Sequence, residues 1–258
     1  MSYGILFDVT RCIGCEACMD ACHESHGQPE TTSYELSEHN YTVVQTRELP
    51  DEEEVYIRRM CMHCEDPSCA SACPVGAFTK TPEGPVTYDG DKCIGCRYCM
   101  VACPFEVPKY QWGSLAPVVR KCDMCYDRIK EGGIPACAEA CEEGATVFGE
   151  REELIALARQ RMKDDPDSYH PYIYGLNEAG GTSMLFLTPV PPEELGYQTA
   201  GMNEVFPNLT GAAMKEIPNI FSFSGVFLYG LWWVINRRMK LQKMDPDGTP
   251  VHEEESVS

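Results

Sequence analysis

Sixteen cysteines in four groups of four constrain the fold of this 258-residue chain more than any other feature of its sequence. An even number of cysteines is compatible with disulfides, zinc sites or iron–sulfur clusters, and only the spacing distinguishes these chemistries. The groups are Cys12, Cys15, Cys18 and Cys22; Cys61, Cys64, Cys69 and Cys73; Cys93, Cys96, Cys99 and Cys103; and Cys122, Cys125, Cys137 and Cys141.

The third group has the spacing C-x2-C-x2-C-x3-C-P and ends at Pro104. In the bacterial ferredoxins that share this run, three cysteines bind one [4Fe–4S] cluster and the fourth binds the other cluster of a pair. Disulfides do not explain cysteines at every third position, and zinc sites use C-x2-C pairs. The spacing therefore indicates four [4Fe–4S] clusters, with iron bound through all sixteen cysteines. The fourth group, C-x2-C-x11-C-x3-C, would pass for a zinc site if taken alone.

An internal repeat relates the first and third groups. The segment Asp8–Cys15 matches Asp89–Cys96 in register, and each copy follows a short stretch that favours a strand, Ile5–Phe7 or Val86–Tyr88. We therefore predict an α+β fold of two ferredoxin-like (dicluster) units with loop-rich insertions, plus one C-terminal transmembrane helix.

Composition and periodicity predict the segments outside the cysteine groups. Residues 23–60 are a polar, Glu-rich insertion, which we expect at the surface and to which we assign no chemistry. The other expected elements are a pair of strands at Thr42–Gln45 and Val55–Arg58, an amphipathic helix at Glu152–Lys163, a buried strand at Met184–Val190 and a linker over residues 191–215.

The charged residues exclude one class of partner. The chain has 40 Asp and Glu against 21 Lys and Arg, so its net charge of −19 argues against binding to nucleic acid, which needs a basic patch. His23 and His63 lie beside cysteines, but each site already has four thiolates, so we do not expect either to be a ligand. Five cations flank the cysteines and either raise the cluster potentials or are ordinary surface charge: Arg11, Lys92, Arg97, Arg120 and Lys121.

An apolar segment follows the linker. Ile220–Ile235 has no formal charge, and with Ile217–Asn219 it approaches the ~20 residues that span a bilayer. We expect a transmembrane helix over residues 216–238; the alternative is a buried helix that packs on a partner.

Positive charge predicts the orientation of this helix. Arg237, Arg238, Lys240 and Lys243 follow it, and such clusters favour the cytoplasmic side, so the tail, residues 239–258, is expected inside. No secretion signal is expected, because the first residues run directly into the first cysteine group.

These motifs together resemble the four-cluster iron–sulfur subunits of membrane-bound respiratory oxidoreductases, among them formate dehydrogenase, nickel–iron hydrogenase and the dimethyl sulfoxide, polysulfide and nitrite reductase complexes. Beyond Cys141 the chain is most similar to the formate dehydrogenase and hydrogenase-2 types, which have a single C-terminal membrane helix. The matching segments are Cys61–Cys64, Cys93–Tyr110, Arg120–Cys125, Phe148–Leu154, Tyr174–Gly175 and Gly180–Ser183.

The resemblance implies which cysteines share a cluster. In each set, three ligands come from one group and the fourth from another group. Glu142 stands where the pattern usually has proline, which concerns the potential of that cluster rather than its existence. The implied sets are Cys12, Cys15, Cys18 and Cys141 (cluster 1); Cys61, Cys64, Cys69 and Cys103 (cluster 2); Cys93, Cys96, Cys99 and Cys73 (cluster 3); and Cys122, Cys125, Cys137 and Cys22 (cluster 4).

The resemblance also implies a role without catalytic residues. The chain would transfer electrons between a catalytic subunit, of molybdenum/tungsten-pterin or nickel–iron type, and a membrane subunit that binds quinone or haem. The four-cluster domain would span residues 1–149 and the extension with its linker residues 150–215, on the periplasmic side of the inner membrane. Two alternatives stay open here: a soluble cytoplasmic polyferredoxin and a zinc-stabilised interaction module.

Overall fold

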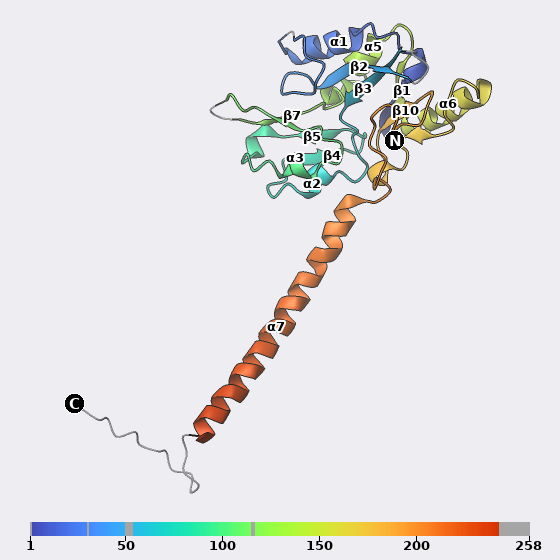
Figure 1. The fold of residues 1–258 in the computed structure, drawn as a ribbon. Helices are drawn as coiled ribbons and strands as arrows, with labels where there is room; N and C mark the ends of the chain where they lie inside the picture. Colours follow the sequence, from blue (N-terminus) through green and yellow to red (C-terminus); the bar gives the residue numbers. More distant parts are fainter. Residues whose placement is uncertain (1, 30, 50–53, 115–116, 243–258) are drawn as a thin grey trace. The chain divides into compact units, whose positions relative to one another are not determined.

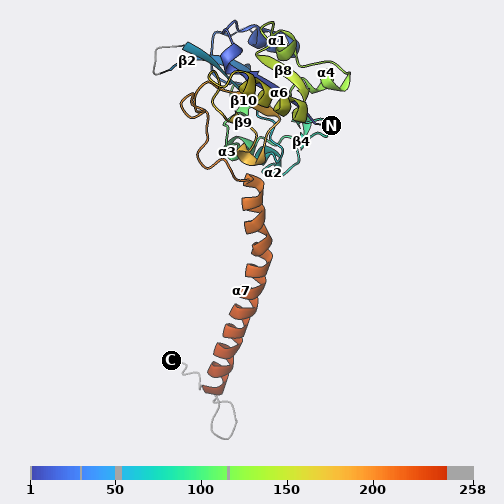
Figure 2. The same ribbon diagram turned by 90° about the vertical axis from the view of Figure 1, so that its right-hand side faces the viewer.

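The computed structural model describes residues 2–29, 31–49, 54–114 and 117–242. The chain divides into two units, Met1–Pro207 and Asn208–Ser258. The first unit is mixed α and β (Figures 1 and 2), as the sequence predicts. Sixteen residues of the expected tail, 243–258, lie outside the described part of the chain.

A four-stranded sheet in the order β8-β1-β10-β9 forms the centre of the first unit. The first strand, β1, is parallel to β10 and antiparallel to β8, while β9 pairs antiparallel with β10. The bounds are β1 (Tyr3–Asp8), β8 (Thr146–Glu150), β9 (Ile173–Tyr174) and β10 (Met184–Leu187). The predicted buried strand is therefore confirmed, although it ends three residues before Val190.

Helix α6 (Arg151–Asp164) packs on one face of this sheet and confirms the predicted amphipathic helix. Leu154, Ile155 and Ala158 are buried against Leu6 and Leu185. These helix positions recur at intervals of three and four residues, so they share one face.

The hairpin of β2 (Thr42–Glu48) and β3 (Glu54–Met60) confirms the two predicted strands but corrects their expected surface position. Val43, Ile57 and Arg58 are at most 1% exposed. The polar composition of residues 23–60 concealed the apolar side chains of the hairpin, which belong to the main core. Helix α1 (Ala17–His26) packs against β2.

The remaining elements of the first unit are short and flank the cysteines. Two further hairpins pair β4 with β5 and β6 with β7. These strands are β4 (Phe78–Lys80), β5 (Val86–Tyr88), β6 (Lys109–Tyr110) and β7 (Val119–Arg120). The helices are α2 (Ser68–Ser71), α3 (Tyr98–Ala102), α4 (Tyr126–Lys130) and α5 (Ala136–Glu139), with 3₁₀ turns η1 (Val9–Arg11), η2 (Gly90–Lys92) and η3 (Glu178–Gly180).

Helix α7 (Phe206–Gln242) is longer than predicted at both ends. It begins inside the expected linker, because Pro207 occupies the first helical turn, where proline is tolerated, and it continues through Pro218. Within the described residues, Glu216–Leu241 is the one helical segment long and apolar enough to cross a membrane. No residue of its apolar window is buried, which does not support a helix buried within this chain.

Candidate iron–sulfur sites

Two of the four cysteine groups are carried by loops with the same backbone. Asp8 accepts a hydrogen bond from the Thr10 amide (3.2 Å), and Asp89 accepts one from the Asp91 amide (3.1 Å). Each aspartate thereby caps a 3₁₀ turn that ends at the first cysteine of its group. The sequence repeat is thus a repeat of structure.

Glycine is required in both loops. Gly14 has φ +69° and Gly95 has φ +71°, in the left-handed region that other residues rarely adopt. A Cβ atom on Gly14 would collide with the ring of Tyr56, and one on Gly95 would lie 2.9 Å from Tyr110 Oη. The loops must therefore fold tightly, and this brings the first three cysteines of each group close together.

The second and fourth groups share another design. Each has the sequence Pro-x-Cys-Ala-x-Ala-Cys, starting at Pro67 or Pro135. The proline directly precedes helix α2 or α5, which carries the third cysteine of the group, and the fourth follows the helix. Helix α2 packs on α3 and helix α5 packs on α1, so the second group lies beside the third and the fourth beside the first.

We call the first and fourth groups with their flanking residues the outer half (residues 8–27 and 121–146), and the second and third groups the inner half (residues 60–110). Figure 1 shows α1, α5 and β2 together in one part of the first unit, and α2, α3, β4 and β5 in the other. The outer half is therefore built from two segments that are distant in sequence.

In the outer half, the structure places the expected ligands of cluster 1 around one cavity of about 280 Å³. Of the other four cysteines of this half, Cys22 lies on α1 and Cys137 on α5, and these two helices pack on each other. Burial, followed by the charges of Cys22 and Cys137, raises the pKa of Cys122, and burial with the charge of Cys137 raises that of Cys125. The cysteines that line the cavity are Cys12, Cys15, Cys18 and Cys141.

In the inner half, the expected ligands of cluster 2 line one enclosed pocket between α2 and the segment that follows α3. Helix α3, which carries Cys99, packs on α2, and burial with the charges of the three other expected ligands of cluster 3, Cys93, Cys96 and Cys73, raises the pKa of Cys99 to about 11. The cysteines of the pocket are Cys61, Cys64, Cys69 and Cys103. The assignment of individual ligands to clusters stays a prediction.

The surroundings of the cysteines suit thiolates that bind a metal better than free thiols. All sixteen cysteines are free of disulfides. Burial, with the charges of nearby thiolates, raises the pKa of Cys18 to about 11 and that of Cys69 to about 12. Thiolates crowded in this way are unfavourable unless a cation binds them, and metal binding supplies that cation while releasing protons.

Backbone amides point at ligand sulfurs in both halves. Gly95 donates to Cys93 Sγ (3.4 Å) and Ala77 to Cys73 Sγ (3.2 Å). Met124 donates to Cys122 Sγ (3.3 Å), and the Thr146 amide to Cys141 Sγ (3.3 Å). Such bonds stabilise the thiolate form that a metal requires.

The histidines beside the cysteines are buried and held by the protein. His63 Nδ1 accepts a hydrogen bond from the Val86 amide (2.9 Å), and His23 Nε2 lies 2.8 Å from Asn40 Oδ1. Burial, with the charges of Lys121 and Lys80, holds the pKa of His63 well below its ordinary value, so its ring is neutral. Both histidines are therefore buried residues beside the ligands rather than surface residues.

Of the five cations expected near the ligands, Lys121 is buried and the other four are exposed. Lys121 Nζ donates to the carbonyl oxygens of Val86 and Cys122, the latter at 2.8 Å. Burial lowers its pKa, but the charges of Cys61, Cys69 and Cys122 raise it on balance. The four exposed residues are Arg11, Lys92, Arg97 and Arg120.

Sequence reasoning missed two polar residues next to the ligands. Arg58 is fully buried near the cysteines of the outer half. His26 Nε2 lies 3.0 Å from Asp123 Oδ1, and its Nδ1 lies 2.9 Å from the Cys22 carbonyl oxygen. No motif signals either one, because their position depends on the packing of the hairpin and of α1.

Comparison with known proteins agrees with this geometry. The chain matches two families, both described as 4Fe-4S dicluster domain, over residues 53–151 and 11–77. It is 41% identical over 236 residues to the hydrogenase-2 operon protein HybA of Escherichia coli O157:H7, covering 75% of this chain and 72% of that protein. It is 39% identical over 258 residues to a protein of Nitratidesulfovibrio vulgaris, covering 93% of this chain and 68% of that protein. It is also 36% identical over 197 residues to the iron-sulfur subunit of the nitrate-inducible formate dehydrogenase of Escherichia coli K12. This match covers 70% of this chain and 66% of that subunit.

Proposed function

Because this chain belongs to the 4Fe-4S dicluster family and is an iron–sulfur electron-transfer subunit with four [4Fe–4S] clusters, we propose that it connects a catalytic subunit with a quinone- or haem-binding membrane subunit of a respiratory complex. The names of its relatives, which refer to hydrogenase-2 and formate dehydrogenase, support a nickel–iron or a molybdenum/tungsten-pterin partner. The bound clusters supply centres that each accept and release one electron.

The observation that carries this proposal is the continuous series formed by the four proposed ligand sets. Sets 1 and 4 each have a ligand on helix α1, Cys18 and Cys22 respectively. Sets 2 and 3 each have a ligand on or just after helix α2, Cys69 and Cys73 respectively. Lys121, directly before Cys122 of set 4, lines the pocket of set 2. The sets therefore follow one another in the order 1, 4, 2 and 3.

Both ends of this series reach the surface of the first unit. Cys15, in the set of cluster 1, is exposed, and its neighbour Ile13 is 59% exposed. At the other end, Ile94 and Val101, beside the cysteines of cluster 3, are 65% and 88% exposed. A series that is accessible at its two ends suits a subunit that receives electrons from one partner and passes them to another.

The proposed location is the inner membrane, with the first unit on the periplasmic side and the C-terminus in the cytoplasm. The apolar segment Glu216–Leu241 supports a single crossing. Arg237, Arg238 and Lys240 lie at its C-terminal end, and the Arg237 guanidinium is 5.2 Å from the centre of the Trp233 ring. Cations favour the cytoplasmic end of a membrane helix, and tryptophans are enriched at both membrane interfaces.

Iron analysis with electron paramagnetic resonance tests the proposed ligand sets. We expect about sixteen irons per chain in anaerobically purified protein, four for each cubane cluster. Substitution of Cys141 by alanine should alter the same signal as substitution of Cys15, because both belong to cluster 1. Cys22→Ala is the matched control and should alter a different signal. If Cys141 and Cys22 affected the same signal, the proposed sets would be wrong.

Membrane topology is tested separately on the full chain in cells. A protease-cleavable tag after the last residue should be protected in intact spheroplasts, whereas a tag at the N-terminus should be cleaved. Extraction should require detergent. Release of the chain by high salt alone would contradict the membrane anchor and favour the soluble polyferredoxin.

A further inference from the structure

Arg58 is a buried cation on strand β3 whose charge has no carboxylate partner in the described part of the chain. Its side chain is 0% exposed. Nε donates to Thr42 Oγ1 (2.8 Å) and Nη1 to Thr146 Oγ1 (3.1 Å), both of which are neutral acceptors. Among the described residues, Nη2 has no hydrogen-bond partner, and no Asp or Glu forms an ion pair with Arg58.

A buried, unpaired charge is expensive. Transfer of an ion from water to the protein interior costs several kcal/mol even after relaxation, unless an opposite charge compensates it. The guanidinium lies beside the cavity of cluster 1, because its acceptor Thr146 and the ring of Phe7, whose centre is 6.0 Å from the guanidinium carbon, both line that cavity. Burial lowers the pKa of Arg58, but the charges of the thiolates of Cys137, Cys18 and Cys122 raise it on balance.

These three thiolates belong to two different ligand sets. Cys18 is in the proposed set of cluster 1, whereas Cys122 and Cys137 are in that of cluster 4. The guanidinium therefore faces both sites of the outer half. Lys121, the other buried cation near ligands, faces Cys61 and Cys69 of cluster 2 as well as Cys122.

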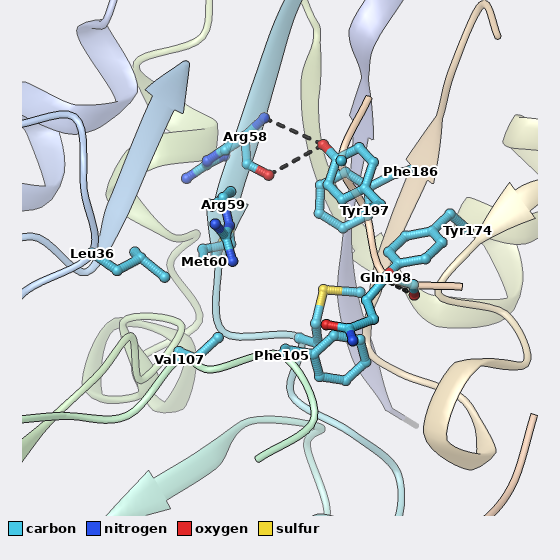
Figure 3. A pocket seen from close by; sticks show the side chains of 12 residues that line it. Leu36, Arg58, Arg59, Met60, Phe105, Val107, Tyr174, Phe186, Tyr197 and Gln198 are labelled. Carbon is cyan, nitrogen blue, oxygen red and sulfur yellow. Dashed lines mark hydrogen bonds between the residues drawn. The ribbon is translucent and has the colours of Figure 1, made fainter. Parts of the chain in front are cut away.

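Tyr197 fixes the backbone of Arg58 from the side opposite to the guanidinium. Its amide donates to Tyr197 Oη (3.3 Å), and the Tyr197 hydroxyl donates to its carbonyl oxygen (3.2 Å). Figure 3 shows both bonds, with the guanidinium directed away from the Tyr197 ring. Together with the two threonines, this clamp holds the charge in one position.

We propose that Arg58 is a shared counterion for the two cluster sites of the outer half, that its Nη2 donates a hydrogen bond toward one of them, and that its charge raises both reduction potentials. Reduction adds one negative charge to a cluster, and a fixed positive charge nearby stabilises the reduced form. This inference rests on the ligand sets proposed above but goes beyond them, because it assigns a role to a residue that is not a ligand.

The test is a redox titration of the full-length Arg58→Met protein, followed by electron paramagnetic resonance in the anaerobically purified complex. Two of the four clusters should become harder to reduce. At a fixed potential, the ratio of reduced to oxidised cluster should fall at least tenfold for each of them. A tenfold change corresponds to a shift of 59 mV in the reduction potential of a one-electron couple. The other two should keep their potentials. The Cys141→Ala and Cys22→Ala variants identify which signals belong to clusters 1 and 4.

Two further variants isolate the charge. Arg59→Met removes the same charge one position along β3, from a half-buried side chain, and should leave all four potentials unchanged. Arg58→Lys keeps the positive charge and should keep both potentials closer to those of the unmodified protein than Arg58→Met does.

The iron content of each variant separates this inference from the proposed function. Four clusters with unshifted potentials in Arg58→Met would overturn the inference and leave the electron-transfer role intact. If Arg58→Met fails to assemble its clusters while Arg58→Lys assembles them, the positive charge is required at this position, as proposed. If both Arg58→Met and Arg58→Lys fail to assemble clusters while Arg59→Met assembles them normally, only the shape of Arg58 matters. That result would overturn the inference. Absence of clusters from the unmodified chain would instead contradict the proposed function.

Discussion

The loops that begin at Asp8 and at Asp89 have matching sequences and the same backbone, but the protein supports them differently. The Asp8 side chain is 0% exposed and accepts from Arg161 Nη1 (2.7 Å) and Tyr169 Oη (3.0 Å). The Asp89 side chain is 44% exposed, and its ion pair is with Lys92 (3.0 Å), which is itself on the surface. The aspartate of the outer half is therefore tied to α6, whereas the side chain of the inner-half aspartate forms its ion pair within its own loop.

The glycines of the two loops show the same contrast. Gly14 fits against the ring of Tyr56 from strand β3, while Gly95 approaches only the hydroxyl of Tyr110. The conformation that gathers the cysteines is thus set locally, by the capping aspartate and the left-handed glycine. What differs is the amount of tertiary structure that depends on each loop.

The largest expected effect comes from removal of the two aspartates. Asp8→Ala should lower the free energy of unfolding by about 3 kcal/mol, because it leaves the partly buried Arg161 charge without its carboxylate partner and removes the cap of the 3₁₀ turn. Asp89→Ala should cost only about 1 kcal/mol, mainly for the lost cap. Anaerobic urea unfolding followed by circular dichroism measures both. Equal losses would contradict the difference in support.

A smaller difference is expected between the two glycines. Gly14→Ala should cost about 2 kcal/mol, since a left-handed non-glycine residue is strained and its Cβ would also meet the Tyr56 ring. Gly95→Ala should cost about 1 kcal/mol, the backbone strain alone, because the Tyr110 hydroxyl can move aside. Urea midpoints give both values.

The Gly14→Ala/Tyr56→Ala double variant controls for the collision. It should cost less than the sum of the two single substitutions, because the second change removes the ring that the new methyl group meets. Additive costs would show that the ring plays no part.

The smallest effects are expected from the outer partners of the two aspartates. Tyr169→Phe removes one hydrogen bond to the buried Asp8 carboxylate and should cost about 1 kcal/mol. Lys92→Met breaks an exposed ion pair and should cost about 0.5 kcal/mol or less. The same unfolding assay distinguishes the two variants. Only the effect of Lys92→Met should disappear in high salt, because salt screens an exposed ion pair. A larger effect for Lys92→Met than for Tyr169→Phe would reverse the proposed order.

The sequence was most informative where a feature depends on local spacing. The cysteine runs predicted the cofactors, short apolar or β-branched runs predicted β2, β3 and β10, and helical periodicity predicted α6. These features are local because a ligand loop, a strand pattern and a helix face each need only a few successive residues.

Features that depend on distant partners could not be predicted in this way. Arg58 and Arg59 are adjacent and of the same type, so no pattern indicates that Arg58 is the one that is buried among thiolates. The polar composition of residues 23–60 suggested the surface, yet their hairpin contributes to the core. The beginning of α7 was also missed, because prolines and glycines in residues 191–215 suggested a linker, whereas Pro207 lies in a helical turn that accepts it.

The position of β1 between β8 and β10 has a consequence for synthesis of the chain on the ribosome. Its apolar residues Ile5, Leu6 and Phe7 are covered only after Thr146–Glu150 and Met184–Leu187 have been made. With the proposed ligand sets, both inner sets are complete once Cys103 has emerged, whereas both outer sets wait for Cys137 and Cys141. On these proposed sets, the inner cluster sites would be the first to become available for iron, while the first strand of the chain is still unpaired.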